Sequence, residues 1–145
     1  MKMFMAVAAA AVLFGAAQAQ ASFAGKYTGT GKVYDSTGFK QNCESMKVEV
    51  AQTASTLKIS ADFKCGGMAL ANPGGELDIK GGELFKKGQK VGTISADSVT
   101  INQKEGDTVM KTTAKLKGNT LTFKFETTSP ARPGVTITYE GTVKR

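Results

Sequence analysis

Cys43 and Cys65 carry the most distinctive chemistry in this chain, because they are its only cysteines. Residues 1–21 have the pattern of a secretory signal peptide, and two cysteines in an exported protein normally pair, so the sequence predicts a disulfide between them. The loop that it would close spans about 23 residues, and such a constraint stabilises a fold by roughly 3 kcal/mol. A metal site is the alternative, but the chain has no histidine, and two thiolates do not fill the four positions around zinc. We therefore expect a structural disulfide and no metal ligands.

The lack of histidine also limits catalysis. Neither a Ser-His-Asp nor a Cys-His arrangement can be built without it, and the cysteines are expected to be oxidised. The carboxylates are scattered among lysines on the polar faces of expected strands, where cross-strand ion pairs account for them. We therefore predict no catalytic residues, no enzymatic activity and no cofactor.

The N-terminal segment, residues 1–21, has the features of a secretory signal peptide. A short basic start precedes an apolar, alanine-rich run over residues 3–17, and small residues at the spacing of a cleavage site predict cutting after Ala19 or Ala21. The apolar run is shorter than the ~20 residues that a transmembrane helix requires. The sequence thus predicts an exported protein, periplasmic or secreted, whose single folded domain is residues 22–145.

The folded domain is basic, with 18 basic and 12 acidic side chains once Lys2 is removed with the signal peptide. Because the basic residues are spread along the chain, without interleaved aromatic side chains, we expect a solvated surface and no nucleic-acid partner. The densest basic patch contains Lys86, Lys87 and Lys90, at the tip of an expected hairpin. Lysines at a hairpin tip usually block edge pairing, and a local anion contact is the alternative for these three.

Alternation of apolar and polar residues covers most of the domain and predicts an all-β fold of roughly eight to ten antiparallel strands. The first strand, residues 25–33, resembles the last, residues 136–144. Pairing these two would close an up-and-down meander into a barrel without free edges, and a two-sheet β-sandwich is the alternative. Gly29 and Gly31 fall on the inward face of the first strand, as expected at a barrel corner. Residues 39–44 are expected to be an irregular link.

The inward side chains of such a barrel either fill it or line a cavity, and the sequence leaves both outcomes open. The opposite faces carry lysine, threonine and glutamate, so we do not expect a barrel embedded in a membrane. Residues 66–75 interrupt the alternation; we expect a short buried strand or a loose helical turn, or alternatively a segment that covers an opening. The aromatic and aliphatic side chains expected near a small apolar ligand are Tyr27, Phe63, Met68, Leu70, Phe123 and Tyr139.

The first strand also carries a family resemblance. Residues 23–29 read Phe-Ala-Gly-Lys-Tyr-Thr-Gly, and the central Gly-Lys-Tyr resembles the Gly-x-aromatic element of the calycin superfamily, the lipocalin-like and fatty-acid-binding-like barrels. Tyrosine stands where lipocalins usually have tryptophan. The resemblance implies a cup-shaped, lipocalin-like barrel that binds a small apolar molecule.

The chain is similar, in addition, to the periplasmic metalloprotease-inhibitor barrels of bacteria. In that family one disulfide flanks the second and third strands, as Cys43 and Cys65 do here. This chain is longer and lacks the family's tryptophan. Because the mature N-terminus of those inhibitors enters the protease cleft, the similarity would make Ser22 and Phe23 functional residues. The sequence therefore predicts a binding module for a small apolar molecule, with an interaction module for an exported protein as the alternative.

Overall fold

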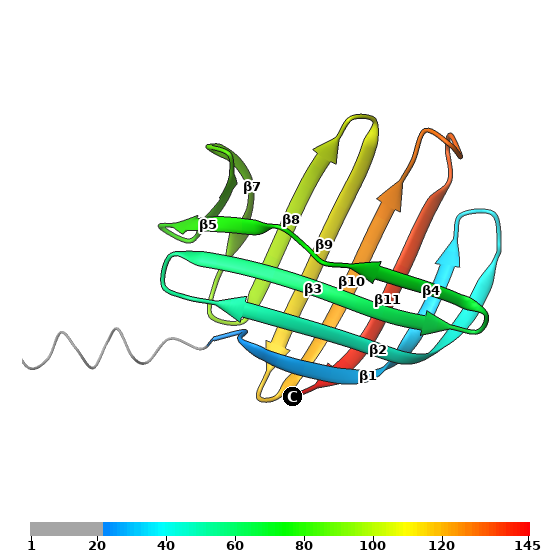
Figure 1. Cartoon of the computed structure of the whole chain (residues 1–145), viewed down its shortest axis with the longest axis horizontal. Coiled ribbons are helices and arrows are strands. Elements are labelled where there is room, and N and C mark those ends of the chain that lie inside the picture. Colours follow the sequence, from blue (N-terminus) through cyan, green and yellow to red (C-terminus); the bar gives the residue numbers. More distant parts are fainter. Residues whose placement is uncertain (1–21) are drawn as a thin grey trace, which may run out of the picture.

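The computed structural model describes residues 22–145, whose regular structure is antiparallel β-sheet (Figure 1). The eleven strands are β1 (Gly25–Asp35), β2 (Lys40–Gln52), β3 (Thr56–Cys65), β4 (Met68–Asn72), β5 (Glu76–Lys80), β6 (Glu83–Lys86), β7 (Gln89–Ile94), β8 (Ser98–Glu105), β9 (Thr108–Lys117), β10 (Thr120–Thr128) and β11 (Thr136–Lys144). Within residues 22–145 there is no helix with the length and apolarity that a membrane span requires. The predicted signal peptide, residues 1–21, lies outside the described residues.

The strands form a closed ring within a single sheet. From β5 to β11 each strand pairs with the next, β11 pairs with β1, β1 with β2, β2 with β3, and β3 returns to β5. Ten of the eleven strands therefore form the ring, while β4 pairs with β3 alone. This topology confirms the predicted meander and the pairing of the first strand with the last, from Thr28↔Lys144 to Asp35↔Ile137.

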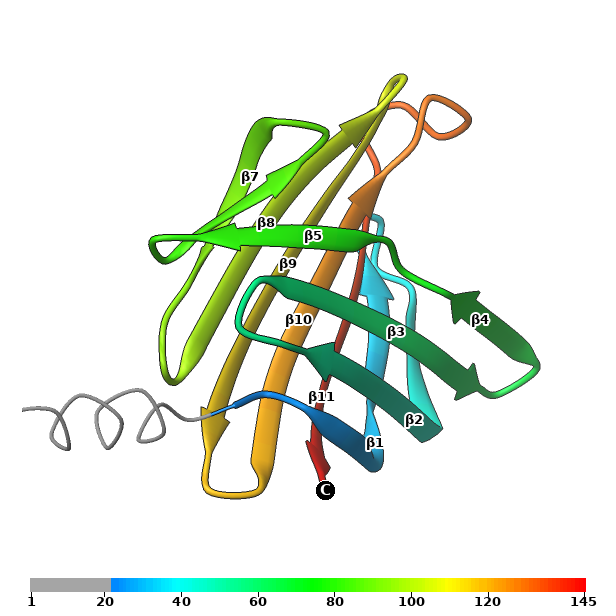
Figure 2. The same ribbon diagram turned by 60° about the vertical axis from the view of Figure 1, so that its left-hand side comes forward.

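The ring is not an even barrel, because the ladders from β3 through β5, β6 and β7 to β8 are short. Three residue pairs join β3 to β5 and three join β7 to β8, whereas nine join β10 to β11. Figure 2 shows β2, β3 and β5 crossing in front of β8 to β11 rather than running alongside them. The sheet thus folds over on itself and places two crossing layers face to face.

Glycines in β1 allow the sheet to turn this corner. A Cβ atom at Gly29 would overlap the backbone oxygen of Thr142, and one at Gly31 would overlap that of Glu140. The β1–β2 register also shifts between these two glycines, which marks a β-bulge. The strand therefore bends in its middle. Its second half runs alongside β11, whereas its first half crosses the direction of β9 to β11 (Figures 1 and 2).

Two local predictions need correction. Residues 39–44 are not an irregular link, because β2 begins at Lys40 and its first residues pair with β1 up to Tyr34. The short strand expected within residues 66–75 is present as β4, but it is mostly exposed rather than buried. It pairs along one edge only, with β3.

The core is closed at the end of the ring where the first described residues and the C-terminus meet. We call this end the floor and define it by Phe23, Tyr27, Leu121 and Val143, all at most 2% exposed. The Tyr27 hydroxyl donates a hydrogen bond of 2.7 Å to the Phe23 carbonyl. Arg145 Nη1 donates to the Tyr27 hydroxyl at 3.0 Å and lies across the outside of the floor. The first and last described segments therefore seal one end of the ring.

Candidate ligand-binding cavity

A cavity of about 620 Å³ lies inside the ring, beyond the floor. Its lining is mainly aliphatic and aromatic and comes from both crossing layers, including Val48, Ile59, Ala61, Leu70 and Leu77 of β2 to β5 and Ile101, Met110, Phe125 and Ile137 of β8 to β11. Sites for small molecules typically enclose about 300 to 1,000 Å³ and are mostly apolar. The interior is therefore hollow, and its size and lining suit a small apolar molecule.

One wall of the cavity is aromatic. The Phe63 ring of β3 stacks on Phe123 of β10 with centroids 5.4 Å apart, and it lies 5.5 Å from the Tyr139 ring of β11. Phe125 extends the wall from β10, with its centroid 6.3 Å from that of Tyr139. Alternation places these side chains on inward faces, and the fold of the sheet brings β3 onto β10 and β11. The wall joins the two layers and offers flat apolar surface to a ligand.

Tyr139 adds a polar group to this wall. Its ring is partly buried, and burial raises the pKa of its hydroxyl, which therefore stays protonated at neutral pH. Among residues 22–145 we find no hydrogen-bond partner for this hydroxyl, whereas the Tyr27 hydroxyl bonds Phe23 and Arg145. A bound molecule with an acceptor atom can accept a hydrogen bond from Tyr139.

The lining becomes more polar and more exposed with distance from the floor. Along β8, the inward residues Val99 and Ile101 are 2% and 8% exposed, Gln103 is half-buried, and the Glu105 side chain is 60% exposed. We call this end the mouth and define it by the polar side chains that line the cavity there, Asn72, Lys86, Gln103, Glu105 and Thr127. The cavity thus has an apolar interior and one polar end.

An ion pair lies at the mouth. Lys86 Nζ, at the end of β6, is 2.8 Å from Glu105 Oε1, at the end of β8. The hydrogen bond from Lys86 and the charge of its ammonium group hold the pKa of Glu105 below its usual range. Lys86 is the one cationic side chain, and Glu105 the one anionic side chain, in the described lining of the cavity.

Four of the six side chains predicted near a ligand line this cavity: Phe63, Leu70, Phe123 and Tyr139. Tyr27 does not line it, because its ring is buried in the floor under the Arg145 side chain. Met68 does not line it either, because it begins β4 with its side chain turned to solvent and is 44% exposed.

Several lining residues were not named as ligand contacts from the sequence. Met110, Thr112 and Ile137 occupy inward positions of β9 and β11, and the same alternation that predicted the strands could have identified them. Gln103 and Glu105 continue the inward positions of β8 with polar side chains, so no apolar pattern marks them.

The three lysines of the predicted anion contact do not converge on one point. Lys86 lies at the mouth, whereas Lys90 pairs with Glu83 at 3.0 Å and does not line the cavity. Lys87 occupies the turn between β6 and β7 in a left-handed backbone conformation and is exposed. The structure therefore separates the patch into a lysine at the mouth and two lysines on the outer surface.

The predicted disulfide is present between Cys43 and Cys65. Both residues are buried, and the bond links β2 to the end of β3. Since β4 pairs only with β3, the bond also anchors the β3–β4 hairpin to the ring. Elsewhere in the described chain, no group of three or more acidic or cysteine side chains is arranged to hold a metal ion.

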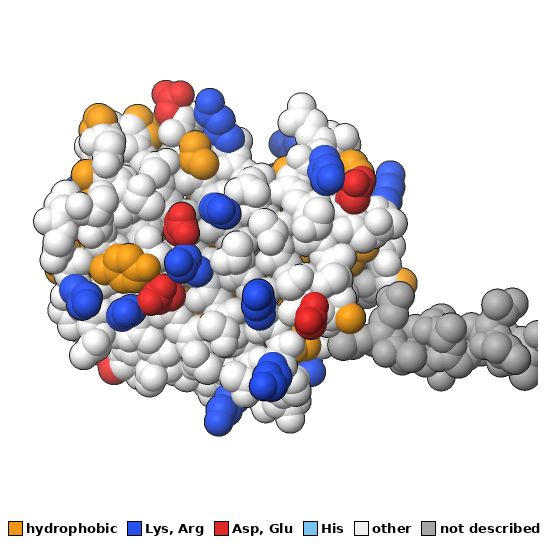
Figure 3. All heavy atoms as spheres, turned by 180° about the vertical axis from the view of Figure 1, so that it is seen from behind, with side chains coloured by type: hydrophobic (Ala, Val, Ile, Leu, Met, Phe, Trp, Pro, Cys, Tyr) orange, Lys and Arg blue, Asp and Glu red, His pale blue; other side chains and the backbone are white. Residues whose placement is uncertain are grey.

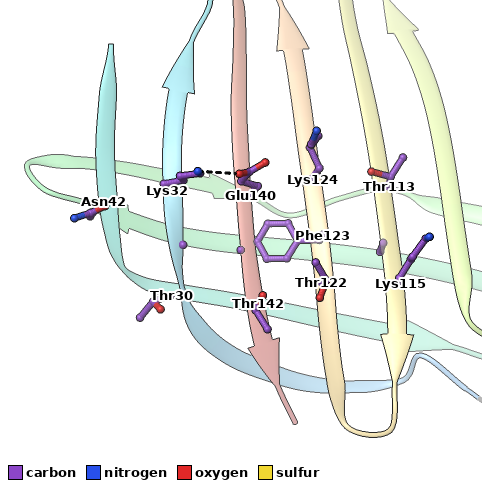
Figure 4. A pocket seen from close by; sticks show the side chains of 13 residues that line it. Thr30, Lys32, Asn42, Thr113, Lys115, Thr122, Phe123, Lys124, Glu140 and Thr142 are labelled. Atoms are coloured by element: carbon purple, nitrogen blue, oxygen red, sulfur yellow. Dashed lines mark ion pairs between the residues drawn. The ribbon is translucent and has the colours of Figure 1, made fainter. Parts of the chain in front are cut away.

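A second hollow, of about 690 Å³, lies on the outer face of β1 and β9 to β11 (Figure 4). It forms where Gly31 of β1 pairs with Gly141 of β11, because neither residue has a side chain to fill the space. Threonines and lysines make up much of its lining. Lys32 pairs with Glu140 at 3.3 Å across it. Figure 3 shows cationic and anionic side chains interspersed over this side of the molecule. This outer hollow is an open depression that is bordered by side chains of both charges.

Comparison with known proteins gives this chain no relative: no family model, no curated protein and no solved structure matches it. Functional inference therefore rests on the cavity, its mouth and the disulfide.

Proposed function

We propose that this protein is an exported, non-enzymatic binding module that holds a small apolar molecule inside its ring of strands. The observation that carries the proposal is the cavity of about 620 Å³, with an apolar interior that spans both layers of the sheet. Burial of apolar surface supplies the binding free energy, at roughly 25 cal/mol per Å² removed from water. The partially filled interior leaves that surface available to a ligand.

Two features support export and a binding role. A disulfide persists in an oxidising compartment, which is compatible with a periplasmic or secreted protein. The acid–base groups at the mouth, Lys86 and Glu105, are paired with each other at the surface, and the chain has no histidine. Binding without catalysis is the function that these groups favour.

The protease-inhibitor alternative receives less support. In that role, residues at the start of the folded domain would extend into a partner's cleft. Here the Phe23 ring is 1% exposed, its N–H donates to Gln52 Oε1 at 2.8 Å, and its carbonyl accepts from Tyr27. Phe23 closes the floor, so its withdrawal would open the core.

Binding of N-phenyl-1-naphthylamine, an uncharged dye that fluoresces in apolar surroundings, tests the proposed function. Thr112 and Thr113 are neighbours on β9, but Thr112 faces the cavity and Thr113 faces the outer hollow. We expect saturable 1:1 binding to the native protein. Thr112→Phe, which fills the cavity, should weaken binding by about tenfold or more, and Thr113→Phe should leave it unchanged.

Circular dichroism would establish that both variants are folded. Absence of saturable dye binding by the native protein would contradict the proposed function. Equal losses in Thr112→Phe and Thr113→Phe would place the dye outside the cavity and would contradict it as well.

A further inference from the structure

We propose that the ligand is a single-chain amphiphile with an anionic head group, which replaces Glu105 as the partner of Lys86 at the mouth while the chain occupies the cavity. This inference rests on the proposed function, and it specifies the class of molecule that the same cavity takes. It follows from three observations, namely the polarity gradient of the lining, the position of Lys86, and the interrupted ladder between β7 and β8.

The polarity gradient orients the ligand. The described lining carries no charged side chain other than the Lys86–Glu105 pair, and that pair lies at the polar end of the cavity. A charged group buried deeper would lose its hydration without a compensating partner. A molecule with one apolar end and one charged end is therefore bound with its apolar end toward the floor.

Lys86 is placed to meet the head group. Its Nζ lies 3.8 Å from the position that a Cβ atom of Gly75 would occupy, so the ammonium reaches from β6 toward the turn between β4 and β5. On its other side it contacts Glu105 of β8. The ammonium thus lies between the two sides of the mouth, where an anion that emerges from the cavity can contact it.

The ladder beside the pair is open. β7 pairs with β8 only from Gly92↔Ile101 to Ile94↔Val99, so the first residues of β7 and the last of β8 are not joined by backbone hydrogen bonds. The Lys86–Glu105 contact is the ion pair that bridges β6 and β8 across this unpaired stretch. An amphiphile can enter here without breaking the sheet.

Exchange of the Glu105 carboxylate for the ligand's head group leaves Lys86 with an anionic partner throughout. Glu105 is more exposed than Lys86, with side chains 60% and 31% exposed, so the carboxylate can return to water while the half-buried ammonium keeps an anionic partner. Exposed ion pairs contribute little to stability, and their loss is easily offset by a new pair. No bond is made or broken, and no proton needs to move.

Decanoate and decanol test this inference, because they share a chain and differ in the head group. The native protein should bind decanoate more tightly than decanol at neutral pH. Glu105→Gln removes the competing carboxylate and should raise the affinity for decanoate by about two- to fivefold without affecting decanol. Lys86→Met should abolish the preference, and Lys86→Arg should retain it.

Lys90→Met is the matched control, since Lys90 forms an ion pair of 3.0 Å with Glu83 outside the cavity lining. It should leave both affinities unchanged. If decanol and the dye bind but Lys86→Met keeps the decanoate preference, the inference is wrong and the proposed function stands. If neither decanoate, decanol nor the dye binds to the native protein, both are wrong.

Discussion

Strands β8 to β11 run from the floor of this ring to its mouth, and their inward residues have opposite roles at the two ends. Near the floor the inward residues are large and apolar, and Leu121 pairs with Val143 on one side and Leu116 on the other. Near the mouth the inward positions hold Gln103, Thr127 and half-buried Ile137. Near the floor the apolar surface is therefore buried by packing, whereas near the mouth it remains accessible to a ligand.

This contrast indicates that the residues important for stability and those important for binding lie at different positions along the same strands, not on different strands. A substitution a few residues along β10 or β11 changes which of the two properties it affects.

The largest effect is expected for Leu121→Ala in the floor. Leu121 is 2% exposed, and truncation of a fully buried leucine costs about 2 to 5 kcal/mol of unfolding free energy. Ile137→Ala at the mouth should cost less, about 1 kcal/mol, because that side chain is only half-buried. Urea unfolding of both variants measures the difference, and equal costs would remove the distinction between floor and mouth.

Loss of the disulfide should come next. The double variant Cys43→Ser, Cys65→Ser should lose about 3 kcal/mol of unfolding free energy, because the unfolded chain is no longer constrained. It should also bind the dye more weakly, since Leu70 of the β3–β4 hairpin lines the cavity. Unfolding and dye titrations measure the two effects. Unchanged dye affinity would show that this hairpin does not shape the cavity.

The smallest effect concerns a loop near the mouth. The Thr37 hydroxyl donates to Asp35 Oδ1 at 2.6 Å, and this bond, with the N–H groups of Thr37 and Phe39 and the charge of Arg132, holds the pKa of Asp35 below its usual range. A lowered carboxyl pKa stabilises the fold above the unfolded value, about 3.9 for aspartate, and this contribution is lost as the pH falls through the lower folded value.

Asp35→Asn should therefore flatten the acid limb of the curve of unfolding free energy against pH. Asp107→Asn, an exposed substitution in the turn between β8 and β9, is the control for the loss of one carboxylate. An acid limb equally steep in Asp35→Asn and the native protein would rule out this role of Asp35.

Much of the ring could be predicted from the sequence, because alternation is a local signal. It placed Phe123 and Tyr139 on inward faces, and the two inward glycines predicted the corner in β1. The disulfide could be predicted because Cys43 and Cys65 are the only two cysteines in the sequence. In contrast, the start of β2 is polar and lacks alternation, and only its pairing with β1 makes it a strand.

The cavity could not be predicted, since it depends on where ladders end rather than on which residues face inward. The short ladders from β3 through β5, β6 and β7 to β8 make the ring uneven, and their lengths are not encoded in any apolar pattern. The Lys86–Glu105 pair joins residues of two strands that are not neighbours in the sheet. The lysine patch was visible in the sequence, but its division between mouth and outer surface was not.

Methyl ¹H–¹³C spectra during titration with N-phenyl-1-naphthylamine test the central claim most directly. If the dye enters the cavity, the methyl signals of Leu70, Met110 and Ile137 should shift in proportion to its occupancy. Those of Val143, buried in the floor outside the cavity lining, should remain in place. Shifts confined to exposed Met68 and Val109, or no shifts at saturating dye, would contradict a ligand-binding interior.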